Sequence, residues 1–215
     1  YISQIKAFKD NVSIKSCLSY TFSVSNSQGT SLIKDRPFTA EMTRSIMLLK
    51  EKHYRPRMAD YRIGVFFTGR EQLGEGAKTT APVYYANRWD IQPSDTAAYL
   101  RGEKVKPTKQ IVFYIDNTFP EKWKPYLREG VTQWNELFEQ IGFKDVVAAK
   151  DFPTDDPEFD PDNIKYSCVR YAPSSIENAM GPSWVDPRSG EILNASVYLY
   201  HNVIKLISSW LFVQT

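Results

Sequence analysis

The period of the hydrophobic residues changes once along the chain, and this change constrains the fold more than any other feature. Up to about residue 106, five segments alternate or run apolar in β-branched and aromatic residues. Beyond the polar stretch 101–110, an apolar run at 111–116 leads into a segment of helical period. We therefore expect an α+β protein with a β-rich domain at 1–106 and a second domain at 107–215. The strands expected in the first domain are 2–8, 12–24, 42–52, 61–69 and 82–91.

A single apolar stripe predicts a long helix after the first strand of the second domain. Its members recur three or four residues apart, as residues on one helical face do: Trp123, Leu127, Val131, Trp134, Phe138 and Ile141. Thr118 and Glu121 have the spacing of a capping box, and Gly142 suits the C-terminal cap. Pro125 fits the helix either in its first turn or at a bend. We expect the stripe to pack on one face of a mixed sheet formed by residues 111–200, with Trp134 in the core.

The rest of the second domain is expected to add three strands and a short helix. The strands are predicted at 145–151, 164–172 and 191–200, and the helix at 203–213, folded back onto the last strand. Between the first two of these strands, residues 151–163 carry six carboxylates and three prolines. Such oxygens could bind Ca²⁺, but their spacing does not match an EF-hand, so a solvated acidic loop is the favoured interpretation.

The net charge argues against two classes of partner. The chain has 27 basic and 25 acidic residues, a formal charge of +2, so it offers no broad basic field to nucleic acid or to a membrane surface. Its longest apolar run, 203–213, contains a Lys and is shorter than the roughly 20 residues of a membrane-spanning helix. The first residues lack an initiator Met and the layout of a signal peptide, and we expect an internal start. Cys17 and Cys168 have no CxxC or Cys/His neighbours, which favours two separate, half-buried thiols over one disulfide.

Two long blocks of the second domain resemble a known family. They are VFYIDNTFPEKWKPYLREGVTQWNELFEQIGFKDVVAAKDFPTDDP and NAMGPSWVDPRSGEILNASVYLYHNV. They are similar to the first half of the catalytic domain in large bacterial zinc-dependent metallopeptidases related to the metzincins. HYRPRMADYRIGVF and NRWDI also resemble the β-rich region that precedes that domain. The resemblance implies a partial metzincin-like sheet with one long helix, in a protein that is secreted, periplasmic or associated with the cell envelope.

The family's chemistry depends on HExxH, in which two His one helical turn apart bind Zn²⁺ and the Glu polarises the attacking water. This sequence has no HExxH, and its two histidines are His53 and His201. Because a catalytic zinc needs three protein ligands, we expect both to be structural or surface residues. We expect no catalytic residue and no zinc in this chain. The resemblance implies that the zinc helix follows in the parent protein, with Zn²⁺ as cofactor, a peptide or protein as substrate, and an inactive chain on its own.

The resemblance also implies what this part of a peptidase contributes to substrate binding. An edge of its sheet is expected to pair with an extended substrate backbone. By resemblance, that edge consists of Asn178, Ala179, Met180, Gly181, Pro182, Ser183, Trp184 and Val185. Gly181 would let a substrate backbone approach closely, and Trp184 could form the wall of a subsite. The alternative, given equal weight, is that GPSWVDPRSG is only a tight connection between strands.

Two other classes of function remain open. A non-catalytic β-rich module could hold peptide or glycan through some of its 13 Tyr, 12 Phe and 5 Trp, although most are expected in the core. A structural interaction domain would present a large flat apolar patch. A missing zinc helix should also leave apolar strands uncovered, so we expect self-association, or association with the remainder of the parent chain.

One acidic residue suggests a latency device. Asp60, within RPRMADYRIGV, could cap a catalytic zinc by carboxylate ligation. The favoured alternative is that Arg55, Arg57 and Arg62 form ordinary surface pairs with nearby acids.

Overall fold

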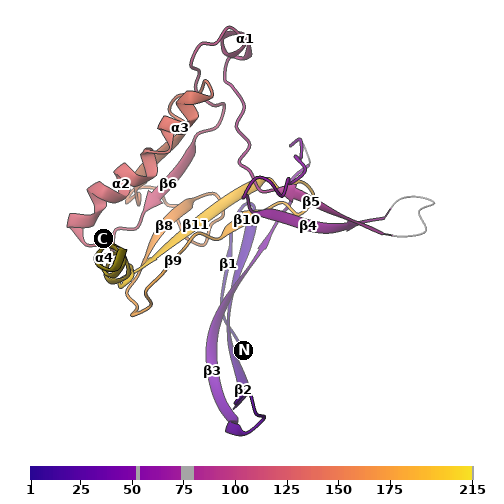
Figure 1. Cartoon of the computed structure of the whole chain (residues 1–215), viewed down its shortest axis with the longest axis vertical. Coiled ribbons are helices and arrows are strands. Elements are labelled where there is room, and N and C mark those ends of the chain that lie inside the picture. Colours follow the sequence, from indigo (N-terminus) through magenta and orange to yellow (C-terminus); the bar gives the residue numbers. More distant parts are fainter. Residues whose placement is uncertain (52–53, 74–79, 215) are drawn as a thin grey trace. The chain divides into compact units, whose positions relative to one another are not determined.

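In a computed structural model, the described residues (1–51, 54–73 and 80–214) form two compact units. The first comprises Tyr1–Lys50 with Asp162–Ile164, and the second comprises Glu51–Pro161 with Lys165–Thr215. Both strands and helices are present, which confirms the α+β class (Figure 1). The boundary predicted after residue 106 does not coincide with this division. Segment 51–106 lies in the second unit, where Val105 forms a β-bridge with Phe143.

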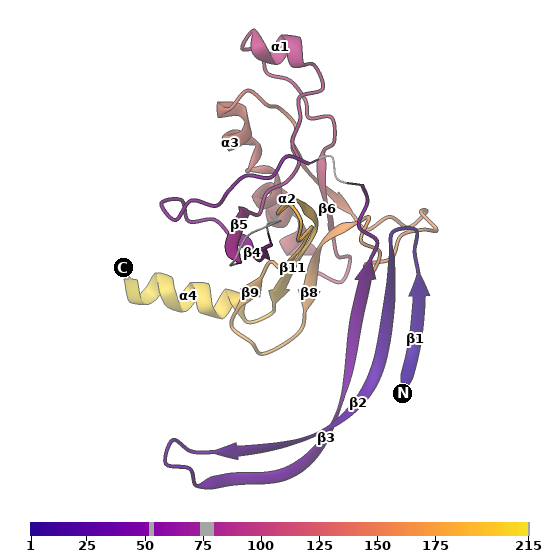
Figure 2. The ribbon, with the colours of Figure 1, turned by 90° about the vertical axis from the view of Figure 1, so that its right-hand side faces the viewer.

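The first unit is an antiparallel sheet in the order β1-β2-β3. Its strands are β1 (Ile2–Ala7), β2 (Asn11–Ser25) and β3 (Ser31–Met47). The last two form a long hairpin (Figure 2). Asn26 closes its turn, because its side-chain oxygen accepts from the backbone N–H groups of Gln28 and Thr30. The strand predicted at 42–52 matches only the end of β3, because pairing with β2 extends the strand through residues without an apolar pattern.

The base of the hairpin is its most buried part. Asn11 is 4% exposed, and its side chain bonds the backbone on both sides of Asn163. It donates to the carbonyl of Asp162 at 2.9 Å and accepts from the N–H of Ile164 at 3.1 Å. Lys6 also pairs with the Asp162 carboxylate at 2.8 Å. Asp162 and Asn163 of the acidic loop, with Ile164 after them, are thereby part of the first unit.

The second unit is built on a mixed sheet in the order β10-β11-β8-β6-β7, with β9 also pairing with β11. Neighbours among β6, β7, β8 and β11 are parallel, whereas β9 and β10 are antiparallel to β11. The mixed sheet predicted for residues 111–200 is confirmed. Its strands are β6 (Ile111–Ile115), β7 (Val147–Asp151), β8 (Ser167–Ala172), β9 (Ala179–Met180), β10 (Ser183–Val185) and β11 (Ile192–Tyr200).

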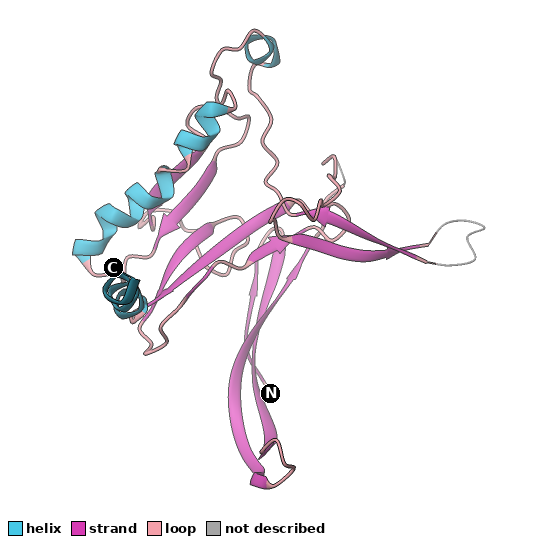
Figure 3. Cartoon of the chain, in the orientation of Figure 1, coloured by secondary structure: helices cyan, strands magenta, loops and turns pink. Residues whose placement is uncertain are grey.

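Helices line one side of this sheet (Figure 3). A 3₁₀ turn, η1 (Glu121–Trp123), leads into α2 (Lys124–Thr132), and α3 (Asn135–Gln140) follows. Trp123, Leu127 and Val131 pack on a buried cluster of Ile115, Phe119 and Val169. The helix is therefore amphipathic as predicted, but it is divided at residues 133–134. Trp134 lies at this division and is 60% exposed, so its assignment to the core was wrong.

At the ends of the helical segment, the predictions for Pro125 and Gly142 are confirmed and the predicted capping box is wrong. Pro125 lies in the first turn of α2, where no hydrogen bond is lost. Gly142 caps the segment with φ 88°, and the N–H of Phe143 reaches the carbonyl of Phe138 at 3.0 Å, as in a Schellman motif. The predicted capping box is wrong. Thr118 donates its hydroxyl to Asp116 at 2.7 Å, and the cap residue of α2 has no side-chain hydrogen bond.

Two smaller elements complete this part of the second unit. A hairpin joins β4 (Phe67–Gln72) to β5 (Ala81–Ala86). The described residues of the region 1–106 contain five strands, the number predicted, although the predicted strand 61–69 shares only residues 67–69 with β4. The short helix α1 (Thr96–Leu100) is capped by the Asp95 side chain, which accepts from the N–H of Ala98. Ala98 joins Val105, Ile111, Phe143, Val146 and Val147 in a second buried cluster.

The last helix, α4 (Val203–Gln214), forms where it was predicted but does not fold back onto the sheet. None of its residues is buried, and Figure 2 shows it projecting beyond β11. Its outward side chains include Trp210, Phe212 and Val213, with exposed fractions of 55%, 90% and 83%. Within the described part of the chain, no helix is both long and apolar enough to cross a bilayer.

Candidate substrate-binding edge and adjoining groove

The eight residues predicted to bind substrate lie along one edge of the mixed sheet. Ala179 and Met180 form β9, opposite Leu199 and Tyr198 of β11. Ser183, Trp184 and Val185 form β10, and its register against β11 shifts after Trp184. In the described chain β10 is the terminal strand, with β11 as its partner. The structure thus places the predicted segment on an exposed, antiparallel edge.

Gly181 and Pro182 separate the two short strands. The Pro182 carbonyl accepts from the N–H of Ser196 at 2.9 Å, which keeps the segment attached to β11. A Cβ built on Gly181 would meet nothing within 4 Å. Asn178, Gly181 and Pro182 are exposed, as are Ala179 and Ser183. The segment has room on its outer side for an extended ligand, and its binding role stays a prediction.

A buried carboxylate fixes the turn that follows the edge. Asp186 is 4% exposed and accepts from the backbone N–H of Arg188 at 2.8 Å and from its guanidinium at 2.6 Å. Gly190 has φ 78°, and a Cβ there would lie 2.6 Å from the carbonyl of Ala86. The Asp186–Arg188 hydrogen bonds therefore fix the turn after β10, and glycine at 190 lets the turn lie close to β5. The Asp-x-Arg motif at residues 186–188 could have predicted this hydrogen-bonded turn, but the turn was not among the sequence-based predictions.

Asp60 is held by a second Asp-x-Arg turn of the same kind. Arg62 donates its backbone N–H and its guanidinium to the Asp60 carboxylate, at 3.0 and 2.6 Å. These bonds lower the pKa of Asp60. For Arg62, the favoured interpretation of an ordinary ion pair is confirmed. Arg55 and Arg57 form no ion pair with a described residue.

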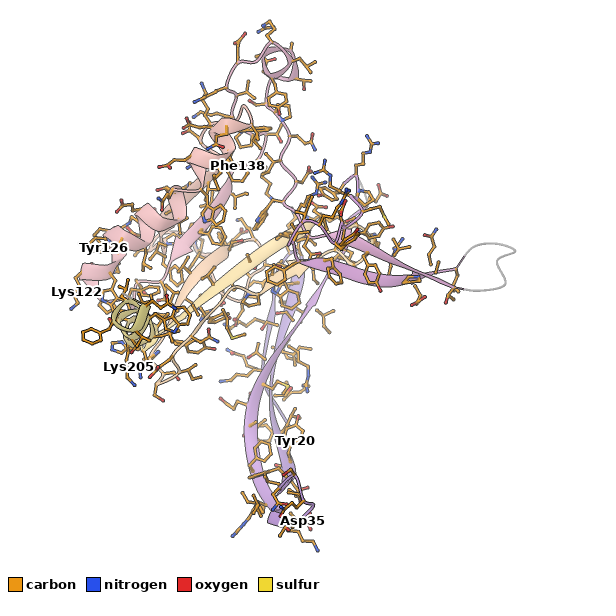
Figure 4. All side chains as sticks on the ribbon, viewed as in Figure 1. Tyr20, Asp35, Lys122, Tyr126, Phe138 and Lys205 are labelled. Atoms are coloured by element: carbon orange, nitrogen blue, oxygen red, sulfur yellow. The ribbon has the colours of Figure 1, made fainter. Side chains whose placement is uncertain are left out.

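An apolar groove of about 520 Å³ opens on the helical side of the sheet. Its floor includes Phe113, Val169 and Val197, and its wall includes Tyr126 and Trp134; Figure 4 labels Tyr126 on α2. No charged side chain among the described residues lines the groove. Strands 111–116 and 191–199, which were expected to present uncovered apolar side chains, contribute Ile111, Phe113, Val197 and Leu199 to this lining. These four side chains are buried or half-buried, so the uncovered face stays a prediction.

The histidine within the described residues has a structural setting. The Nδ1 atom of His201 lies 2.7 Å from the Tyr171 hydroxyl, and its ring stacks on Trp123 at 5.6 Å between centroids. His53 lies outside the described residues. Across residues 1–51, 54–73 and 80–214, no three His, Cys, Asp or Glu side chains gather closely enough to hold a metal ion. The described residues therefore hold no cluster that fits a zinc site.

The acidic loop also uses its carboxylates within the protein. Asp156 accepts from the Tyr166 hydroxyl at 2.6 Å, and Glu158 pairs with Lys165 at 2.9 Å. The bond from Tyr166 lowers the pKa of Asp156. These carboxylates therefore form bonds within the protein, and the choice of a solvated acidic loop in preference to a Ca²⁺ site stays a prediction.

Comparison with known proteins gives one match. Residues 1–94 match a family described as a domain of unknown function, DUF5117. No curated protein and no solved structure matches the chain. The matched region covers β1 to β5 and ends before the mixed sheet begins.

Proposed function

We propose that this chain forms the substrate-binding half of the catalytic domain of a zinc-dependent metallopeptidase, preceded by a β-rich region. The observation that carries the proposal is the exposed antiparallel strand β10, formed at the edge of the mixed sheet by the segment that the family resemblance assigns to substrate binding. An extended peptide on its outer side would extend the sheet by one strand, with main-chain hydrogen bonds providing affinity.

The side chains at this edge supply the specificity. Trp184 is 39% exposed, so one part of its ring is packed and the other can contact a ligand side chain. The lock between Asp186 and Arg188 fixes the end of β10, which reduces the entropy lost when a peptide binds. By resemblance, the parent protein supplies zinc through HExxH, and bound zinc would provide the activated water.

Two measurements test the proposal. In hydrogen exchange on the 215-residue chain, an extended peptide should protect amides of Ser183–Val185, whereas its backbone N-methylated analogue should not. Replacing Trp184 by Ala should weaken peptide binding roughly tenfold. Trp210→Ala, at an exposed site on α4, is the matched control. Protection elsewhere, or equal binding of the methylated peptide, would remove β10 from the site.

The catalytic part requires the full gene product. It should cleave casein, lose that activity on chelation and regain it with Zn²⁺, whereas the 215-residue chain should cleave nothing and retain no stoichiometric zinc. Cleavage that survives chelation would exclude the zinc mechanism.

A second candidate is a peptide- or glycan-binding module, favoured by one cluster on the first unit. Tyr20 and Phe38 stack at 5.4 Å between centroids, and Phe22 meets Phe38 edge-on at 5.7 Å. The three rings are between 40% and 44% exposed, and Figure 4 labels Tyr20 on the hairpin. Glycan or peptide binding that is lost in Tyr20→Ala but retained in Trp184→Ala would support this function over the first.

A further inference from the structure

A second cavity of the second unit is basic, and the proposed peptidase function does not use it. It encloses about 750 Å³. Arg55, Arg57 and Arg88 are among its lining residues, with Asp90 as the carboxylate among them. Its apolar wall includes Trp89, Phe138 and Phe143. The cavity therefore combines an excess of positive charge with aromatic surface, the composition of a site for an anion that carries an apolar group.

Two buried donors beside this cavity lack an acceptor among the described residues. Tyr54 is 7% exposed, and its hydroxyl forms no hydrogen bond with a described residue. The Nε atom of Arg88 is also buried and unbonded. The Arg88 guanidinium lies 5.5 Å from the centre of the Tyr54 ring, so the two donors belong to one stacked pair. Native proteins leave few buried donors without a partner, and such a pair indicates a missing acceptor.

The protonation states of the pair make it a donor site at neutral pH. Burial raises the pKa of Tyr54, and the nearby Arg88 acts in the opposite direction. The phenol therefore keeps its proton, and an arginine stays charged throughout the physiological range. Arg55 and Arg57 are exposed and form no ion pair with a described residue, so their charge is available to a ligand.

We infer that this cavity binds a carboxylate attached to an apolar group. The carboxylate oxygens accept hydrogen bonds from the Tyr54 hydroxyl and from the Arg88 guanidinium. Arg55 and Arg57 supply positive potential, and Trp89 with its aromatic neighbours buries the apolar part of the ligand. A phosphate dianion is less suited, because Asp90 shares the lining. Two sources carry the preferred chemistry: a free aryl- or alkylcarboxylic acid, and the C-terminal residue of a peptide with an apolar side chain. The inference does not rest on the peptidase proposal.

Calorimetry with the 215-residue chain distinguishes these sources. The probes are 3-phenylpropionate and an acetylated tripeptide ending in Phe, each compared with its amide and with acetate. Saturable binding of one or both acids is expected, at least tenfold tighter than that of the amides and of acetate. The tighter of the two acids identifies the source. Equal binding of acid and amide, or no saturable binding of either acid up to about 10 mM, would overturn the inference.

Three substitutions locate the binding. Tyr54→Phe deletes only the hydroxyl, and Arg57→Gln changes an exposed side chain that the fold does not need. Each should weaken acid binding about tenfold, and Arg88→Gln should do so at least as much. Tyr61→Phe and Arg101→Gln are matched controls, since Tyr61 is 97% exposed and Arg101 pairs with Glu103.

Stability separates a binding role from a structural one. Tyr54→Phe removes a buried hydroxyl that has no partner, so the free chain should unfold at the same or a higher temperature while it loses affinity. Unchanged affinity in both Tyr54→Phe and Arg57→Gln would show that the carboxylate does not bind in this cavity.

Discussion

At the scale of single residues, the same short motif has different consequences in two places. Asp60 and Asp186 each accept the backbone N–H and the guanidinium of the arginine two positions later. The Asp60 carboxylate is 34% exposed, so water competes for it and its ion pair contributes little to stability. The Asp186 carboxylate is 6% exposed, so breaking its pair would leave a buried charge without compensation. The sequence carries the same Asp-x-Arg motif at both turns, but it does not reveal which turn is buried.

The two cysteines differ in how far they are buried. Both are free thiols, as favoured from the sequence, but the half-burial expected of both holds for Cys17 alone. Cys168 is fully buried, and burial raises its pKa to about 12. The reactive form is the thiolate, and with a raised pKa it becomes abundant only as the pH approaches 12. At pH 8, Ellman's reagent should therefore modify Cys17 alone in the folded chain.

Denaturant and one variant control this experiment. Unfolding should expose a second equivalent, and Cys17→Ser should react only after unfolding. Rapid reaction of two thiols in the folded, unsubstituted 215-residue chain would contradict the burial of Cys168.

At the scale of elements, the sequence predicts whatever depends on local periodicity. The run 111–116, the glycine at 142 and most of the stripe from Trp123 to Ile141 correspond to observed elements, although Ile141 at the end of the stripe is 57% exposed. The failures concern exposure and tertiary contacts. Trp134 continues the stripe by spacing, yet the break at 133–134 leaves it 60% exposed. The order of the strands, and hence β10 as the edge, depends on long-range pairing that no local pattern specifies. The edge segment itself was identified by family resemblance, and the basic cavity was not identified at all.

Two glycines in the helical region predict opposite effects of the same substitution. Gly142 has φ 88°, and its Cβ would lie 2.9 Å from the Tyr99 ring, so Gly142→Ala should lower the free energy of unfolding by about 1–2 kcal/mol. Gly130 lies within α2 with nothing within 4 Å of its Cβ, so Gly130→Ala should raise that free energy by about 0.5–1 kcal/mol.

Denaturant titration of the two glycine variants measures both effects. Equal effects of the two substitutions would mean that Gly142 does not cap the helix as described.

At the scale of the whole molecule, the second unit has two apolar features that are open to solvent, the apolar groove and the exposed helix α4. The groove beside α2 and α3 has no charged lining residue, and α4 has no buried residue. Soluble monomers rarely expose contiguous apolar patches above a few hundred Å². The two features together therefore favour association.

Trp134 lies in the wall of the groove and is largely exposed. Trp134→Ala should therefore lower the free energy of unfolding by about 1 kcal/mol or less in a denaturant titration, in place of the 3–5 kcal/mol typical of a buried Trp.

We expect the 215-residue chain to self-associate at tens of micromolar concentrations and to bind a hydrophobic dye. Trp134→Lys and Phe212→Lys place a charge in the groove wall and on α4, where the side chains are 60% and 90% exposed, so neither should unfold the chain. Each should shift sedimentation toward the monomer, because burying an unpaired charge at an interface is unfavourable. Leu100→Lys, at a site 79% exposed on α1, is the matched control and should sediment as the parent chain does. If the unsubstituted 215-residue chain is monomeric at these concentrations and binds no dye, the groove is not an uncovered surface in solution. That result would remove this support for the partial peptidase domain.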